Sequence, residues 1–387
     1  MSFSTTTRRT VLANLLRTVA CSTIGAPTLG ALAQSSFGGG RREGIGAMQE
    51  QFRRQFRVPA MSVAFSQNGR FVYDRAGGMA DGQHLTQTTQ NSLFRIADLS
   101  KPITAVTIFS LIEARKLTLG DKVFGPAGIL GAQFSKINYP ATVNDITVDH
   151  LLTHTAGGWA ADSNDPMLHD NGWDESKLIA ETIEKVPLTS RPGTQWAYSN
   201  FGYCVLGRVI EQVTSQPYEA YVQSNILAPC GITGMQIAHN SERQRASNEV
   251  VYVGQYSEDP YKINISRMDA TAGWIASSTQ LVQFLDHVAG APGIPALLKP
   301  ESIRMMTTPA SATPPGDARY ARGWMVGYNG AGSWWHSGSL PGSTAFMIRN
   351  PDGSSAAALC NTRTQPHDEI DAAFQQTIED MGRGLAG

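Results

Sequence analysis

The order of strand and helix signals along this 387-residue chain constrains its fold more than any other feature. Near the amino terminus, Met61–Phe65 and Arg70–Arg75 are predicted strands, and Asn68-Gly69 between them is typical of a tight β-hairpin. The last third of the chain repeats this pattern, with turns at Asn329-Gly330 and Asp352-Gly353. The strands predicted there are Gly323–Tyr328, Ser333–His336, Thr344–Arg349 and Ser354–Leu359. We therefore expect one antiparallel sheet to which both ends of the chain contribute.

Helical patterns dominate the middle of the chain, and one further helix is predicted near each end, at Gly44–Phe56 and Asp368–Met381. The clearest central helices are Val148–Thr153, Glu175–Lys185, Gly202–Thr214 and Thr279–Ala289. The predicted fold class is α+β, an antiparallel sheet flanked by helices with a mostly helical inserted region. Residues 44–387 would form this domain, with the sheet from about 44–116 and 296–387 and the helical region from about 117–295.

The first 33 residues have the composition of an export signal. The segment Thr7–Leu12 resembles a twin-arginine motif, and small and apolar residues follow it up to Ala33. The Gly- and Ser-rich residues 34–43 are a predicted linker. No later run reaches the ~18 apolar residues that a membrane-spanning helix needs. We therefore expect a periplasmic or secreted protein with no stable membrane span.

Charge and cysteine content limit the function classes. Residues 1–33 hold three arginines and no acid, so the rest of the chain has 28 basic and 32 acidic residues, a net charge of −4. This mild acidity without a basic stripe argues against nucleic-acid binding and suits a small-molecule substrate. Cys204, Cys230 and Cys360 lack metal-ligand spacing and are predicted to be small buried hydrophobes. We expect neither a metal nor a cofactor, and the sequence leaves the oligomeric state open.

One helical motif brings together an acid and a base. In F-R-I-A-D-L-S-K-P-I-T-A-V, Phe94–Val106, Asp98 and Lys101 are three residues apart and would share one face of a helix. Pro102 follows directly and is tolerated in a first helical turn, which predicts Asp98 at or near the helix start. Because aspartate is among the best N-caps, a purely structural role for Asp98 is a serious alternative.

Two further motifs complete a pattern that resembles a known family. Tyr198-Ser199-Asn200 lies in R-P-G-T-Q-W-A-Y-S-N-F-G-Y, and His336-Ser337-Gly338 lies in W-W-H-S-G-S-L-P-G. Together with the helical motif and the segments Ile146–Gly158 and Gly273–Leu285, they resemble the serine β-lactamases and their relatives. The class C β-lactamases, the penicillin-binding-protein-like esterases and the D-aminopeptidases are the nearest in pattern. The resemblance implies a β-lactamase/transpeptidase-like fold.

The resemblance also implies roles for individual residues. The family helix opens with S-x-x-K, so Asp98 stands in the position of the nucleophilic serine, before Lys101. Tyr198 would be a general base or acid, provided that the cationic Lys101 lowers its pKa. Asn200 would form a hydrogen bond to the substrate or to Lys101. His336 would take the lysine position of the K-T-G motif.

The strand motif supplies the remaining candidates. By resemblance, the backbone N–H of Ser339 would pair with that of Asp98 to form an oxyanion hole. Ser337 and Gly338 complete the motif and are expected to contact the substrate. Trp335 could line the substrate pocket or simply pack in the core.

Because Asp98 stands where the family has serine, several mechanisms remain open. Ser100 is adjacent to Lys101, and adjacent helix residues do not face each other, so Ser100 is a poor replacement nucleophile. Attack by Asp98 itself on an ester or amide would give an unfavourable mixed anhydride. The leading hypothesis is a hydrolase of an ester or amide of a small molecule, with Asp98 as general base. The alternatives are a lyase or isomerase that uses Asp98 as base, and a catalytically silent binding protein of the cell envelope.

Two other features of the sequence, a pair of histidines and a polar segment, are interpreted as follows. His150 and His154 are four residues apart but lack a third ligand, so we interpret them as structural. The segment Ala160–Trp173 is rich in Asp, Asn and Gly, and we expect it to form a loop near the site.

Overall fold

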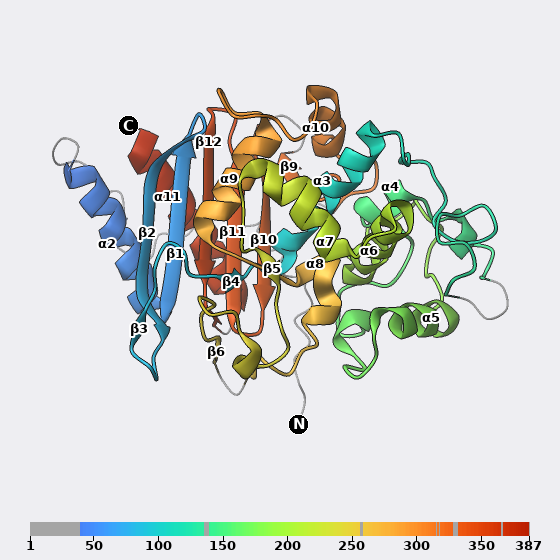
Figure 1. Ribbon diagram of the computed structural model, residues 1–387, viewed down its shortest axis with the longest axis horizontal. Helices are drawn as coiled ribbons and strands as arrows, with labels where there is room; N and C mark the ends of the chain where they lie inside the picture. Colours follow the sequence, from blue (N-terminus) through green and yellow to red (C-terminus); the bar gives the residue numbers. More distant parts are fainter. Residues whose placement is uncertain are drawn as a thin grey trace.

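The strands from both ends of the chain form one eight-stranded sheet (Figure 1). The computed structural model describes residues 39–134, 139–255, 258–314, 316, 318–327, 332–364 and 367–386. The sheet order is β3-β2-β1-β12-β11-β10-β9-β8, and all of these neighbours pair antiparallel. The strands are β1 (Ala60–Gln67), β2 (Arg70–Asp81), β3 (Thr86–Gln87), β8 (Ala318–Tyr320), β9 (Met325–Gly327), β10 (Trp334–Leu340), β11 (Ser343–Arg349) and β12 (Ser354–Cys360). Strand β1 pairs with β12, with Met61 opposite Cys360, so the predicted sheet from both chain ends is confirmed.

The first hairpin shows why local sequence predicts the sheet. Gln67 pairs with Arg70, which leaves Asn68 and Gly69 as a two-residue turn. Both have positive φ, 51° and 77°, as a type I′ turn requires, and asparagine and glycine tolerate this conformation best. The turn predicted at Asn329-Gly330 lies outside the described residues.

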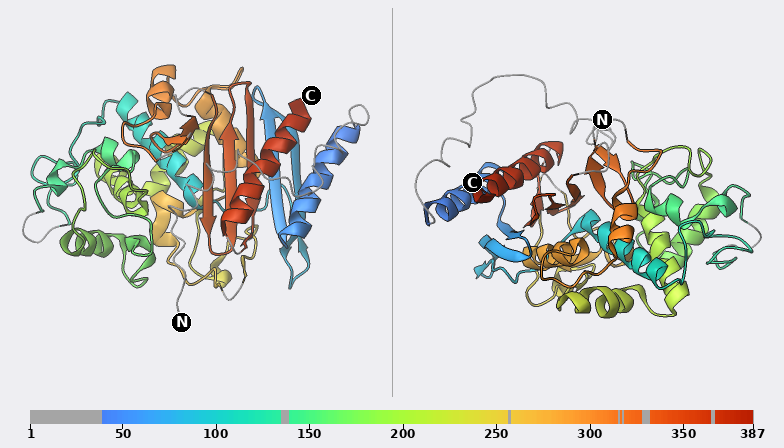
Figure 2. Two further views of the ribbon diagram at one scale, coloured as in Figure 1. Left: turned by 180° about the vertical axis from the view of Figure 1, so that it is seen from behind. Right: turned by 90° about the horizontal axis from the view of Figure 1, so that it is seen from above.

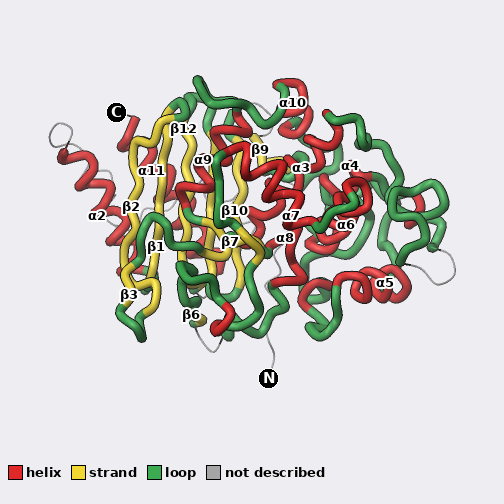
Figure 3. The backbone as a smooth tube through the Cα atoms, in the orientation of Figure 1, coloured by secondary structure: helices red, strands yellow, loops and turns green. Residues whose placement is uncertain are grey.

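Helices cover both faces of the sheet and form a separate region beside it. The helices are α2 (Gly39–Gln55), α3 (Ser100–Glu113), α4 (Val148–Leu152), α5 (Glu175–Lys185), α6 (Asn200–Thr214), α7 (Tyr218–Val222), α8 (Asp269–Ala272), α9 (Ser278–Ala289), α10 (Pro300–Thr307) and α11 (His367–Ala386). Helices α2 and α11 lie across one face (Figure 2), and α9 packs on the opposite face against β1, β11 and β12. Helices α4 to α8 form a helical region beside the sheet (Figure 3). The helix α9, which we predicted as part of the inserted helical region of residues 117–295, packs on the sheet instead.

Short strands tie the insertion to the rest of the domain. Strands β4 (Phe94–Arg95), β7 (Trp274–Ala276) and β5 (Gln236–Ile237) form a small antiparallel sheet. Strand β6 (Val253–Gly254) pairs in parallel with β13 (Thr362–Arg363). Because β4 ends at Arg95 and only a short turn separates it from the start of α3 at Ser100, this small sheet helps to fix where that helix begins.

Helix α3 lies between the sheet and the helical insertion. Its residues from Ser100 to Phe109 are all buried, which is the pattern of a helix that is surrounded by protein on every side. Its neighbours include α6, α7, α8 and α10, and the turn before it contacts β10. The start of α3 is therefore placed where the sheet meets the insertion.

The amino-terminal boundary differs from the prediction. Helix α2 begins at Gly39, so residues 39–43, which we predicted as part of the linker, are helical instead. Arginine and glutamate favour helix, and the Arg42 guanidinium donates to the Val72 carbonyl at 3.1 Å, which holds the first turns against β2. The predicted export signal, residues 1–33, and linker residues 34–38 lie outside the described residues. Within the described ranges, no helix is both long and apolar enough to cross a membrane.

The cysteine prediction is confirmed. Cys204, Cys230 and Cys360 are buried and form no disulfide within the described part of the chain. Burial raises the pKa of each thiol, to about 12 for Cys230, so none is a thiolate near neutral pH.

Candidate active site

Asp98 lies in a short 3-10 turn, Ala97–Leu99, that leads directly into α3. Ala97 has φ 49°, a left-handed conformation that costs a residue other than glycine on the order of 1–3 kcal/mol. Neither the turn nor the helix that follows has a side-chain cap at its start. The prediction that Asp98 lies near the helix start is confirmed, and the alternative that it serves as an N-cap is wrong. Its carboxylate points elsewhere.

The Asp98 carboxylate accepts hydrogen bonds from three separate parts of the fold. Oδ1 accepts from Lys101 Nζ at 2.6 Å and from the Tyr198 hydroxyl at 3.1 Å. Oδ2 accepts from the backbone N–H of Ser339, on β10, at 3.4 Å. The residue is only 6% exposed. A buried carboxylate needs such partners because its desolvation is otherwise costly.

Lys101 is completely buried and has an acceptor for each of its three N–H bonds. Nζ donates to Asp98 Oδ1 at 2.6 Å, to Asn200 Oδ1 at 2.7 Å and to the Thr271 carbonyl at 3.2 Å. It also lies 4.8 Å from the centre of the Tyr198 ring. Three acceptors and an aromatic face together favour the ammonium form. Lys101 therefore acts as a fixed positive charge next to Asp98.

Asn200, the first residue of α6, links this pair to the segment Ala160–Trp173. Its Nδ2 donates to Asp165 Oδ2 at 2.6 Å, while its Oδ1 accepts from Lys101. Asp165 is 1% exposed and belongs to the segment Ala160–Trp173, so the expected loop near the site is confirmed. Sequence reasoning identified the loop but not Asp165, which has no motif of its own.

His336 is buried beside the site and is neutral near neutral pH. Burial and the charge of Lys101 lower its pKa to about 4. Nδ1 lies 2.7 Å from the Ser337 carbonyl, which can only accept, so Nδ1 carries the proton. Nε2 then accepts from the Tyr320 hydroxyl at 3.2 Å. Tyr320, on the short strand β8, was not predicted as a site residue.

The two histidines interpreted as structural have backbone partners, which confirms that interpretation. His150 accepts the Thr147 N–H in a capping box at the start of α4. His154 Nδ1 accepts the Ser199 N–H at 3.1 Å, and burial lowers the pKa of His154 well below its ordinary value. Its ring packs 4.2 Å from that of Tyr198, measured between centroids, and so supports that side chain from behind. Within the described residues, no group of three or more His, Cys, Asp or Glu side chains is arranged to hold a metal ion.

Gly338 allows β10 to approach the Asp98 backbone. A Cβ built at this position would lie 2.7 Å from the Ile96 carbonyl oxygen and 2.8 Å from the Asp98 nitrogen. Both contacts are to backbone, so a side chain would force β10 away. The close approach brings the Ser339 N–H next to Asp98, as the predicted oxyanion hole requires, and in this structure Asp98 Oδ2 occupies that donor.

The other serines of the motifs lie less favourably. Ser100 is completely buried; its Oγ donates to the Ala97 carbonyl at 2.8 Å and accepts from the Trp274 N–H at 3.3 Å. It is engaged away from the carboxylate, as helix geometry predicted. The Ser337 side chain is exposed, and its carbonyl is the group that contacts His336.

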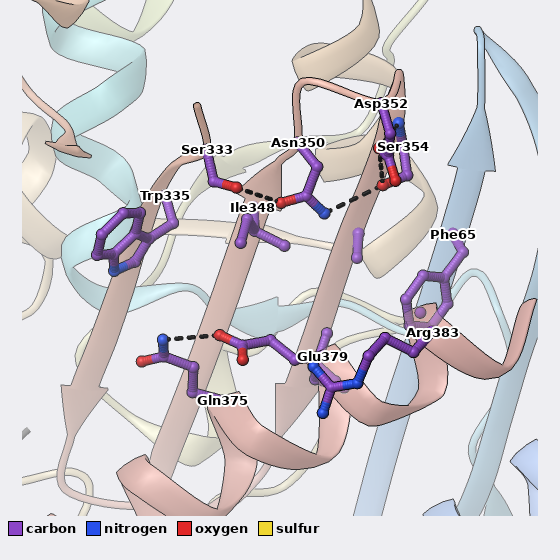
Figure 4. A pocket seen from close by; sticks show the side chains of 13 residues that line it. Phe65, Ser333, Trp335, Ile348, Asn350, Asp352, Ser354, Gln375, Glu379 and Arg383 are labelled. Carbon is purple, nitrogen blue, oxygen red and sulfur yellow. Dashed lines mark hydrogen bonds between the residues drawn. The ribbon is translucent and has the colours of Figure 1, made fainter. Parts of the chain in front are cut away.

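The prediction that Trp335 binds substrate in this site is wrong. Trp335 lines a different cavity of about 420 Å³, between the sheet and α11, where its neighbours include Phe65, Ile348 and Gln375 (Figure 4). Consecutive side chains of a strand point to opposite faces, so a residue next to the inward-facing His336 points away from the site.

Comparisons with known proteins agree with this architecture. The family model described as "Beta-lactamase" matches residues 46–379. "Protein flp" of Staphylococcus aureus (strain MRSA252) is 24% identical over 297 residues, which are 76% of this chain. The chain spans only 57% of the length of that relative. "Esterase EstB" of Burkholderia gladioli is 28% identical over 201 residues, 49% of each chain.

Solved structures show the same fold. The D-amino acid amidase from Ochrobactrum anthropi SV3, complexed with L-phenylalanine amide, superimposes with a TM-score of 0.73 at 19% identity, over 89% of this chain and 98% of that one. The octameric penicillin-binding protein homologue from Pyrococcus abyssi gives a TM-score of 0.70 at 24% identity, over 87% of this chain and 77% of that one. The predicted β-lactamase/transpeptidase-like fold is confirmed.

Proposed function

The chain belongs to the beta-lactamase family, and from this premise we propose that it is a hydrolase that cleaves an ester or amide of a small molecule without an acyl-serine intermediate. One observation carries the proposal: the Asp98 carboxylate contacts both Lys101 Nζ and the Tyr198 hydroxyl at the place where the family motif has its serine. An esterase and a D-amino acid amidase among the similar proteins support ester or amide as the substrate class.

Asp98 acts as the general base in this proposal. It takes a proton from a water molecule, and the water oxygen attacks the carbonyl carbon of the substrate. Tyr198 then gives its hydroxyl proton to the leaving oxygen or nitrogen as the bond to the carbonyl carbon breaks. The proton on Asp98 returns to Tyr198 across their 3.1 Å hydrogen bond. The products are a free acid and an alcohol or amine, and the protein is unchanged.

Lys101 and the backbone donors assist without transferring protons. With its three N–H bonds engaged, Lys101 remains an ammonium and offsets the charge of Asp98 in the resting site. The N–H groups of Ser339 and Asp98 would stabilise the oxyanion. At 3.4 Å, the present bond between Ser339 and Asp98 Oδ2 is longer than an ordinary N–H···O bond, so a substrate oxygen can displace it at low cost.

Neutral His336 favours an uncharged substrate. A lysine in this position of the motif would add a positive charge to the site, whereas an imidazole with a pKa of about 4 adds none near neutral pH. A neutral ester or amide is therefore a better match than a substrate that carries a carboxylate.

A specific observation also favours the silent binding protein as a second candidate. Asp98 Oδ2 lies on the Ser339 N–H, which is one of the two expected oxyanion donors. If the carboxylate stayed there, it would exclude the carbonyl oxygen of a substrate and repel the developing charge.

The decisive experiment compares wild type with Asp98→Ser and Asp98→Asn on chromogenic esters, anilides and a β-lactam, followed by intact mass measurement. The proposal expects turnover by wild type without an adduct, and loss of that turnover in Asp98→Asn. Activity or an adduct in Asp98→Ser alone would support the silent site. Deuterium from solvent in recovered, uncleaved substrate would support a lyase or isomerase instead.

A single turnover in ¹⁸O-labelled water then tests the direct attack of water. The label is expected in the acid product and absent from the peptide that contains Asp98. Label in that peptide would show that Asp98 is a nucleophile and would sink the general-base mechanism.

We also propose that the protein is exported to the periplasm or secreted. The support is the sequence of residues 1–33, with Arg8-Arg9 before a run of small and apolar residues. Expression of the full chain and of an Arg8→Lys/Arg9→Lys variant in a bacterium with twin-arginine export tests it by cell fractionation. Equal amounts of both proteins outside the cytoplasm would contradict the proposal.

A further inference from the structure

Asp165 makes a buried contact that selects one orientation of a site amide. Its Oδ2 accepts from Asn200 Nδ2 at 2.6 Å. A carboxylate can only accept, so it selects the donor end of the amide. The acceptor end, Asn200 Oδ1, therefore faces Lys101 Nζ at 2.7 Å and the Thr271 hydroxyl at 3.3 Å.

We propose that Asp165 is a positioning residue that fixes the amide of Asn200 and thereby holds the Lys101 ammonium on Asp98. The catalytic consequence of this proposal rests on the proposed function, whereas its structural part does not. A rotated Asn200 amide would point Nδ2 at the ammonium, so that two donors would face each other in a buried site. Lys101 would then lose one of its three acceptors and could move away from Asp98.

A buried arginine holds the loop that presents Asp165. Arg267 is 1% exposed, and its guanidinium donates to four backbone carbonyls of this loop. The acceptors are Met167, His169, Asp170 and Trp173, at 2.7 to 3.0 Å. Asp165 Oδ1 also accepts the Met167 N–H at 3.0 Å. The loop backbone is thus fixed immediately beyond Asp165.

The same segment of chain fixes both sides of this contact. Arg267 lies in the 3-10 turn Ser266–Met268, which runs directly into α8. The Thr271 carbonyl of α8 is the third acceptor of Lys101. The consecutive residues from Arg267 to Thr271 therefore set the position of the loop relative to Lys101. This arrangement is expected if Asp165 must contact Asn200 in one fixed geometry.

Asp165→Asn tests the proposal because it keeps the shape of the side chain and can replace the acceptor that faces Asn200 Nδ2 with a donor. If the new side chain uses its single oxygen for the Met167 N–H, it presents its NH₂ to Asn200. Asp162→Asn is the matched control, since Asp162 lies in the same loop, is exposed, and its carboxylate accepts a local hydrogen bond from the Asn164 N–H at 2.8 Å.

The kinetic test is a double-mutant cycle with Asn200→Ala. In the wild-type background, Asp165→Asn is expected to lower kcat/KM roughly 10- to 100-fold, as for the loss of a buried hydrogen bond to a charged group, and Asp162→Asn to change it less than about twofold. In the Asn200→Ala background, Asp165→Asn should have almost no further effect. Equal losses in both backgrounds would show that Asp165 acts only by supporting the loop and would overturn the proposal.

A measurement independent of turnover separates the two proposals. In protein labelled with ¹⁵N-lysine, the Lys101 ammonium resonance is identified by its absence in Lys101→Met. It is expected to shift or broaden in Asp165→Asn and to stay in place in Asp162→Asn. An unchanged resonance in Asp165→Asn would overturn the positioning role. A shifted resonance in a protein that cleaves no ester or amide would support the positioning role and rule out the proposed hydrolase function.

Discussion

The buried pair formed by Asp98 and Lys101 gives a quantitative prediction for stability. Lys101→Met keeps most of the aliphatic stem and removes the ammonium, which is completely buried and donates to Asp98 at 2.6 Å. Asp98, 6% exposed, would keep only Tyr198 and Ser339 as hydrogen-bond donors among the contacts described above. Breaking a buried ion pair from one side typically costs about 3–5 kcal/mol, because an uncompensated charge stays buried. We expect a loss of stability in that range.

A second substitution shows whether the cost arises from the charge. Asp98→Asn alone removes the negative partner, but its amide oxygen can still accept from Lys101, so we expect a smaller loss of about 1–3 kcal/mol. In Asp98→Asn/Lys101→Met neither charge remains. The double variant should therefore be more stable than the sum of the single losses predicts, by about 1.5 kcal/mol or more.

Urea unfolding at neutral pH, followed by intrinsic fluorescence, measures these free energies. A matched control is Lys177→Met, which removes an exposed lysine whose ammonium lies over the Trp173 ring and is expected to cost less than about 1 kcal/mol. If the losses of the two single variants add within about 0.5 kcal/mol, the charges are not coupled. The assignment of Lys101 as a fixed cation would then be refuted.

Three further predictions follow from individual contacts. His336 has a folded pKa of about 4, below its unfolded value of about 6.5, so the unfolded state binds more protons between these values and stability falls as pH decreases. Urea unfolding should show that the contribution of His336 to the free energy of unfolding drops by about 2 kcal/mol between pH 7 and pH 5. The variant His336→Gln should lose this part of the pH dependence. Gly338→Ala should cost about 1–3 kcal/mol and lower kcat sharply, because its Cβ would lie 2.8 Å from the Asp98 nitrogen; unchanged kinetics would contradict the close approach of β10. Trp335→Ala should reduce the thermal midpoint but leave KM for any substrate unchanged, since Trp335 lines the cavity beside α11, and a raised KM would return it to the substrate site.

The features of the fold that depend on neighbours in sequence could be predicted. The Asn68-Gly69 turn needs only two residues with positive φ, and α9 begins with a Ser277–Gln280 capping box just before its apolar pattern. Strand β8, Ala318–Tyr320, has three residues and forms only because β9 offers an edge, so no local signal marks it. Tertiary pairing, which local patterns do not encode, determined that part of the sheet.

The candidate site also contains residues that local motifs located and residues that only distant contacts bring together. The motifs located Asp98, Lys101 and Tyr198, and the structure brings them within hydrogen-bond distance. Asp165 could not be found, because the residue that it contacts in the site, Asn200, is 35 positions away in the sequence. Trp335 was an avoidable error, since strand alternation next to His336 already placed it on the opposite face.

The charge balance of the site bears on the role proposed for Asp98. An oxyanion on the Ser339 N–H would form at the position that Asp98 Oδ2 now occupies. Two unit negative charges about 4 Å apart repel by about 4 kcal/mol at an effective dielectric constant of about 20, which corresponds to a factor of roughly 10³ in rate. An Asp98 that remained ionised as a spectator would oppose the oxyanion by the part of this repulsion that the Lys101 ammonium does not offset. A general base is neutralised in the step that creates the oxyanion, so the net charge of the site stays constant. In the proposed mechanism, Asp98 therefore takes up the proton of the attacking water, and we expect a variant site in which Asp98 cannot do so to bind but not cleave.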